Sequence, residues 1–146
     1  MPPTGSVINM KQVLCKLAGT IVALMPFTAI ADDLTGTERF LCAATHVTRC
    51  YGRGDCESGP PSKWNMPSFI QVDLGKKTLS TPAASAEQRR SPITSLTRDD
   101  GQIFIQGTEN GRAFSMVIAE DTGLVSMAVA LDGITVSVFG VCTPTP

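Results

Sequence analysis

From Ser68 onward, turn-forming residues recur about every 8–13 residues between short runs of β-forming residues. The clearest turn is Asp132-Gly133, because an Asp-Gly pair between two β-rich runs is typical of a type I′ hairpin. Asp99-Asp100-Gly101 gives a second hairpin signal, and Gly107–Gly111 gives a third. This spacing suits an antiparallel meander, in which each strand pairs with the next one along the chain.

The runs between these turns predict six or seven strands, with a polar connection at Thr81–Arg90. Such strands must bury one apolar face and protect their edges, which a small barrel or a sandwich achieves. We therefore predict an all-β fold, mainly an antiparallel meander in a small barrel or sandwich. A curved sheet capped by an N-terminal helix is a third option. The predicted strands are Ser68–Leu74, Thr78–Ser80, Ile93–Arg98, Gln102–Gln106, Arg112–Ala119, Leu124–Leu131 and Ile134–Cys142.

The segment before this sheet, residues 32–67, is predicted to hold a short helix and a cysteine-containing loop region. Thr35-Gly36-Thr37-Glu38 has the form of a helix capping box, and apolar residues follow at helical spacing. We therefore expect a short N-terminal helix over Asp33–Val47. Arg49–Pro67 is rich in Gly, Pro, Ser and Asn, and its prolines exclude a helix or a central strand. Residues 32–67 and the sheet of residues 68–146 should form one domain.

Residues 1–31 have the pattern of a secretory signal peptide. Lys11 and Lys16 supply positive charge, Leu17–Ile30 is uncharged and mostly apolar, and Ala29-Ile30-Ala31 fits a cleavage site of small residues. The apolar run is shorter than the roughly 20 residues that span a bilayer. We therefore expect cleavage after Ala31 and a periplasmic or secreted protein of the bacterial envelope, with no stable membrane anchor after cleavage.

Signal-peptide cleavage would also remove Cys15, one of five cysteines, and leave an even number. In an exported chain this predicts two disulfides. We favour Cys50–Cys56, whose loop contains two glycines able to turn tightly, together with Cys42–Cys142, which would tie the first ordered element to the last strand. Zinc is the alternative for four thiolates, but the spacing lacks the short C-x2-C knuckles of zinc sites. We therefore predict no bound metal.

The charged and titratable residues disfavour several classes of function. With 13 acidic residues against 12 basic ones, the chain has no basic footprint for nucleic acid. His46 is the only histidine, and no G-x-S-x-G sequence offers it a nucleophile. The carboxylates of Asp99-Asp100 and Glu120-Asp121 suit turn formation better than glycosidase catalysis. We therefore assign no catalytic residue and no cofactor, and favour a protein that is not an enzyme.

Loop residues are the best candidates for binding. Trp64, in the segment Lys63-Trp64-Asn65-Met66, is either a contact side chain or a plug that folds back on one end of the sheet. Arg53, Asn110 and Arg112 complete the candidate binding residues. We predict a non-enzymatic exported binding module whose partner is an envelope protein, a glycan or a small ligand. Its oligomeric state is left open.

Two other functions are kept as alternatives. In size, strand content and disulfide use, the chain is similar to small periplasmic inhibitors of lysozyme, which implies inhibition of a cell-wall hydrolase. The loop motifs of those inhibitors are absent from the sequence, so the resemblance assigns no residue a role. The other alternative is a small hydrolase that uses acidic turn residues, in which two carboxylates would face each other across a cleft.

Overall fold

The computed structural model describes residues 32–146, and the predicted signal peptide lies outside this range. Its ten strands form one antiparallel sheet. The strands are β1 (Arg39–Tyr51), β2 (Cys56–Gly59), β3 (Phe69–Asp73), β4 (Thr78–Ser80), β5 (Arg90–Pro92), β6 (Ser95–Asp99), β7 (Gln102–Glu109), β8 (Arg112–Ala119), β9 (Leu124–Leu131) and β10 (Ile134–Pro144).

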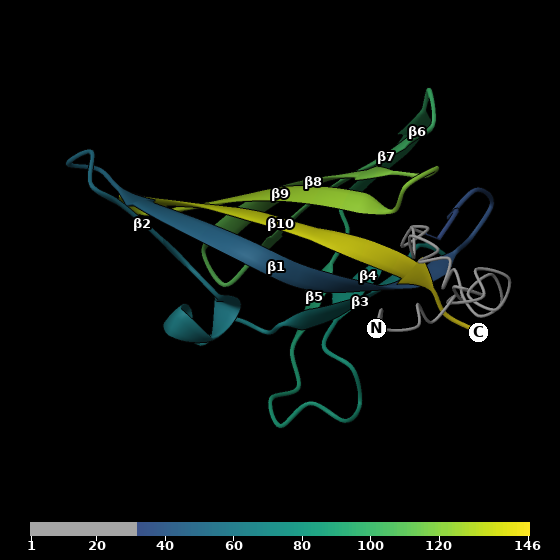
Figure 1. Ribbon diagram of the computed structural model, residues 1–146, viewed down its shortest axis with the longest axis horizontal. Coiled ribbons are helices and arrows are strands. Elements are labelled where there is room, and N and C mark those ends of the chain that lie inside the picture. The colour runs from purple at the N-terminus through teal and green to yellow at the C-terminus, as the bar shows by residue number, and fades with distance from the viewer. Residues whose placement is uncertain (1–31) are drawn as a thin grey trace, which may run out of the picture.

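The sheet curls into a half-barrel (Figure 1). Its strand order is β5-β4-β3-β1-β10-β9-β8-β7-β6, and β2 pairs with β1 beyond the end of β3. In Figure 1, β1 and β10 cross the middle of the molecule, β9 to β6 lie above them, and β3 to β5 turn away below. The mainly antiparallel β-fold predicted from the sequence is confirmed, but the predicted barrel or sandwich is not, because the strands form one sheet whose edge strands β5 and β6 do not pair with each other. Within residues 32–146, the structure contains no helix long and apolar enough to cross a membrane.

Alternation along the strands decides which face of the sheet is buried. On β8, Phe114, Met116 and Ile118 are buried, and the residues between them are exposed or half-buried. The main core cluster fills the concave side near the Cys42–Cys142 disulfide, where Phe40 is fully buried. A smaller cluster around Val47, Val136 and Val138 continues along the same side. The concave face is therefore apolar along most of its length.

The connection between β5 and β6 links the two sides of the curled sheet. The Ile93 N–H donates to the Lys77 carbonyl oxygen at 2.9 Å, and the Thr94 N–H donates to the Gln106 carbonyl oxygen at 2.8 Å. Gly107 permits this close approach, because a Cβ at that position would overlap with the Pro92 carbonyl oxygen and the Phe114 ring. The curl therefore depends on a glycine in the inward-facing row of β7.

The helix predicted over Asp33–Val47 is wrong, because most of this segment belongs to β1. β1 pairs with β10 on one side and with β3 on the other, so partners far along the chain set its conformation. A bulge between Ala44 and His46 shifts the alternation of side chains within β1. The expected capping box is instead a local turn, in which the Thr35 N–H donates to the carboxylate two residues before it at 2.8 Å.

Both predicted disulfides, Cys42–Cys142 and Cys50–Cys56, are confirmed. Each joins two residues that face each other on neighbouring strands. The predicted loop over Arg49–Pro67 is too simple, because it also contains the end of β1, strand β2 and the 3-10 turn η1 (Pro61–Trp64). β2 forms because β1 extends past Arg49 and pairs with β2 there.

The turns explain where the strands end. Asp132-Gly133 does connect β9 to β10, but the predicted type I′ geometry is wrong there, because of the two residues only Gly133 has a positive φ. Type I′ geometry occurs instead at Asp100-Gly101, with φ of 47° and 71°, and at Asn110-Gly111, with φ of 47° and 73°. β8 and β9 have the predicted bounds, and β10 extends to Pro144 because its last residues pair with β1.

Candidate ligand-binding pocket

The register of the sheet brings several hairpins to one end of the half-barrel. Tyr51, the last residue of β1, pairs with Ile134, the first residue of β10, which in turn pairs with Leu131 of β9. Ala113 near the start of β8 pairs with Ala130 near the end of β9. The inward-facing residues at these strand ends therefore surround one opening, whereas the main core cluster fills the other end.

A cavity of about 320 Å³ lies on the concave side at this end. Its walls are largely apolar and come from several strands: Ile70 of β3, Leu79 of β4, Phe114 of β8, Met127 and Val129 of β9, and Val136 of β10. The volume is at the lower end of the range of about 300–1,000 Å³ that is typical of small-molecule pockets. Residues of both core clusters contribute to the walls, so the cavity lies between them.

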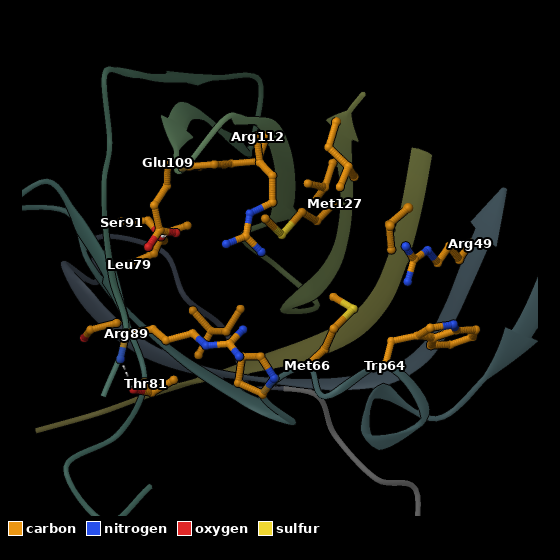
Figure 2. Close-up of a pocket in the computed structure, with 17 residues that line it drawn as sticks. Arg49, Trp64, Met66, Leu79, Thr81, Arg89, Ser91, Glu109, Arg112 and Met127 are labelled. Carbon is orange, nitrogen blue, oxygen red and sulfur yellow. Dashed lines mark hydrogen bonds between the residues drawn. The ribbon is translucent and has the colours of Figure 1, made fainter. Parts of the chain in front are cut away.

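Three arginines line this largely apolar cavity, together with Ser80, Thr81, Ser91 and Glu109 (Figure 2). Arg112 precedes the buried residues Phe114, Met116 and Ile118 in the inward-facing row of β8. Arg49 lies in the inward-facing row of β1 and pairs with the buried Val136 of β10. In Figure 2 the guanidinium groups of Arg49, Arg89 and Arg112 point into the cavity from different sides. Arg49 and Arg112 thus take positions where the alternation calls for an apolar side chain, and such breaks in a folding pattern are expected at functional sites.

Arg89 differs from the other two arginines because its charge is neutralised by the protein. Its guanidinium group lies 2.6 Å from the Glu87 Oε2 and donates to the Asn65 carbonyl oxygen at 3.2 Å. The hydrogen bond that Arg89 donates to the Glu87 carboxylate lowers the pKa of the Glu87 carboxyl below its ordinary value. The Arg89 guanidinium group is therefore already paired within the protein. Its hydrogen bond to Asn65 connects the Thr81–Arg90 segment to the loop that follows η1.

Arg49 and Arg112 have no carboxylate within 4.0 Å among the described residues. The Arg49 Nε is buried without a hydrogen-bond partner, and the guanidinium carbon lies 5.2 Å from the centroid of the Tyr51 ring. Glu109, the carboxylate that lines the cavity, accepts a hydrogen bond from the Ser91 hydroxyl. Two guanidinium groups can therefore receive an acceptor from outside the protein.

Local structure accounts for the placement of these side chains. The Asn110-Gly111 turn puts Glu109 and Arg112 directly opposite each other at the ends of β7 and β8. On the other wall, η1 holds Trp64 and ends at Asn65, whose φ of 53° turns the chain back. Trp64 packs against the smaller apolar cluster, and the Lys63 Nζ lies 5.0 Å from the centroid of its ring.

The structure brings together two of the four residues predicted to bind. Trp64 and Arg112 both line the cavity, and Trp64 also packs against the core, so its two proposed roles are compatible. Asn110 is exposed in the turn before Arg112, and Arg53 is exposed in the Cys50–Cys56 loop, and neither lines the cavity. Arg49, Arg89 and Glu109 also line the cavity and were not among the residues predicted from the sequence. Alternation along β1 would have indicated Arg49 if the segment had been treated as a strand.

The residues considered for catalysis lie elsewhere. His46 is exposed beside the bulge of β1 and does not line the cavity. Asp100 takes part in a type I′ turn, and the Glu120 N–H donates to the carbonyl oxygen of Gly101 at 2.8 Å, so both acidic pairs belong to neighbouring turns. In the part of the chain that the structure describes, no three His, Cys, Asp or Glu side chains gather as metal ligands would. The carboxylate pairs that a hydrolase would use are therefore absent from the cavity walls.

Comparison with known proteins adds no relative: no family model and no curated protein sequence matches the chain.

Proposed function

We propose that this protein is a non-enzymatic binding module, exported to the periplasm or secreted, that takes a small and largely apolar ligand into the cavity. The observation that carries the proposal is the cavity of about 320 Å³ between the two apolar clusters. Protein interiors are close-packed, with few voids larger than a water molecule. In a small domain, an apolar space of this size is therefore better suited to a ligand than to stability.

The lining favours a small ligand over the other two classes of partner. A glycan needs many hydrogen-bond donors and acceptors, whereas most of the exposed cavity surface is apolar despite its three arginines. A protein partner needs a broad exposed surface, whereas the lining side chains face a concave space. Met66 and Met127 add unbranched, flexible side chains that can adapt to the shape of a ligand.

Export is proposed on two grounds. The pattern of residues 1–31 fits a signal peptide, and disulfides persist in oxidising compartments outside the cytoplasm. N-terminal sequencing of the protein recovered from outside the cytoplasm should find Asp32 as the first residue. A protein recovered there with residues before Ala31 still attached would contradict this part of the proposal.

The fluorescence of Trp64 can report ligand binding, because Trp64 is the only tryptophan of the chain and lies in the cavity wall. Titration with decanol or decanoate should change the Trp64 emission and reach saturation. Val129→Phe narrows the cavity and should weaken binding of either probe by about tenfold or more.

Ala130→Phe is the matched control, because Ala130 is the next residue of β9 and its side chain is exposed on the opposite face. This variant should bind like the wild type. If the folded wild-type protein binds neither probe, or if Val129→Phe binds both unchanged, the cavity is not a binding site.

A further inference from the structure

Arg49 and Arg112 reach the cavity from strands that are not neighbours. Arg49 pairs with Val136, Val136 pairs with Val129, and Val129 pairs with Phe114, so three strand spacings, about 14 Å in all, separate β1 from β8, and Arg112 lies two residues, about 7 Å, from Phe114 along β8. The curl of the sheet turns the two strands toward each other. Two extended arginine side chains and an anion between them can span this distance, and both guanidinium groups point into the cavity in Figure 2.

The terminal nitrogens of Arg49 are its donors toward the cavity. The Arg49 Nε is buried and has no acceptor among residues 32–146, whereas the terminal guanidinium nitrogens point into the cavity, where a ligand can reach them. The ring of Tyr51 covers the Arg49 guanidinium group and cannot serve as a strong acceptor. A carboxylate can accept two parallel N–H bonds from a guanidinium group, and such charge-assisted pairs are among the strongest hydrogen bonds in proteins.

The other charges of the cavity indicate how much negative charge a ligand should bring. Arg89 is paired with Glu87, and Glu109 offsets one of the two remaining arginines. One positive charge is then left over. A carboxylate matches this charge, whereas a phosphate monoester carries about −1.5 to −2 at neutral pH.

We propose that the cavity binds an amphiphilic carboxylate. Its headgroup lies between Arg49 and Arg112, and its aliphatic tail packs against the apolar wall formed by Leu79, Met127 and Val129. This inference rests on the proposed binding function and adds the chemical class of the ligand.

The test compares three probes that share a decyl-length tail and differ in charge, on the purified protein with both disulfides formed. Decanoate should bind at least about tenfold more tightly than decanol, because the hydrogen bonds to the arginines are charge-assisted. Decylamine, which is cationic, should bind more weakly than decanol. Added salt should weaken the binding of decanoate more than that of decanol, because it screens partly exposed charges.

Two single substitutions assign the charge effect to these arginines. Arg49→Gln and Arg112→Gln should each weaken decanoate binding about tenfold and leave decanol binding unchanged. Arg39→Gln is the matched control, since it removes the same charge from an exposed position at the far end of β1. It should bind both probes like the wild type. Thermal unfolding verifies that each variant is folded, and if one fails to fold, the other provides the test.

The outcomes distinguish a failure of the carboxylate proposal from a failure of the proposed binding function. If decanol and decanoate bind equally well, the carboxylate proposal is wrong while the binding function stands. If either arginine substitution weakens both probes to the same extent, that arginine supports the cavity wall and does not recognise charge, which also overturns the proposal. If neither probe binds the folded protein, both proposals are refuted.

Discussion

The Cys42–Cys142 disulfide should contribute far more stability than the Cys50–Cys56 disulfide. The two bonds close loops of very different length, with sequence separations of 100 and 6 residues. A cross-link stabilises a protein mainly by restricting the unfolded chain, and the restriction grows with the length of the loop that it closes. The comparison requires two double variants in which both cysteines of one disulfide are replaced by alanine.

The size of the difference follows from the loop lengths. In the chain-entropy model the long loop is worth about 4.7 kcal/mol and the short loop about 2.4 kcal/mol. Burial acts in the same direction, because Cys42 and Cys142 are 5% and 0% exposed within the main core cluster, whereas Cys56 is exposed. Alanine at the two buried positions would also leave a small cavity, which adds about 1 kcal/mol to the loss.

Thermal unfolding followed by circular dichroism measures the effect. For a domain of this size the unfolding entropy is about 0.24 kcal/mol per kelvin, so the expected difference of about 2.3–3.3 kcal/mol corresponds to roughly 10–14 °C in Tm. The variant without Cys42–Cys142 should have the lower Tm. Equal losses in the two variants, or a larger loss for Cys50–Cys56, would refute the reasoning from loop length and burial.

Three further substitutions test the fold and the site. Gly140→Ala would push a Cβ into the Ala43 carbonyl oxygen at the bulge of β1, so it should lower the free energy of unfolding by about 1–3 kcal/mol in a denaturant titration, whereas Gly52→Ala, with 3.5 Å of room, should change it little. His46→Ala should leave both Tm and decanoate binding unchanged, and a loss of binding would mean that this exposed histidine has a role in the site. Asn110→Ala should lower stability by about 1–2 kcal/mol, because alanine tolerates the φ of 47° less well than asparagine, and Asn110→Gly should restore it.

The second half of the sheet could be predicted because its determinants are local. β8 and β9 begin and end where the alternation of side chains and the neighbouring turn residues indicate. The disulfide pairing was also accessible, since the short loop of Cys50–Cys56 contains two glycines and leaves Cys42 and Cys142 as the other pair. Export was predicted in the same way, from the charge and apolar run of residues 1–31.

β1 could not be predicted in this way, because its conformation depends on partners that lie far along the chain. Its first half pairs with β3 and β10, and its second half pairs with β2 and β10. The bulge at Ala44 and His46 interrupts the alternation that would otherwise have indicated a strand. A period-2 pattern with one extra residue can resemble helical spacing, so only the strand pairing resolves the ambiguity.

By itself, then, the sequence determined the β-rich composition, the positions of the later turns, the cysteine pairs and two members of the pocket, Trp64 and Arg112. The tertiary structure alone decided that Arg49, Arg89 and Glu109 join them around one cavity. The physical reason is the curl of the sheet, which brings inward-facing residues of strands distant in sequence to the same opening. Local patterns specify which face of a strand is inward, but only the curl of the sheet specifies what that face meets.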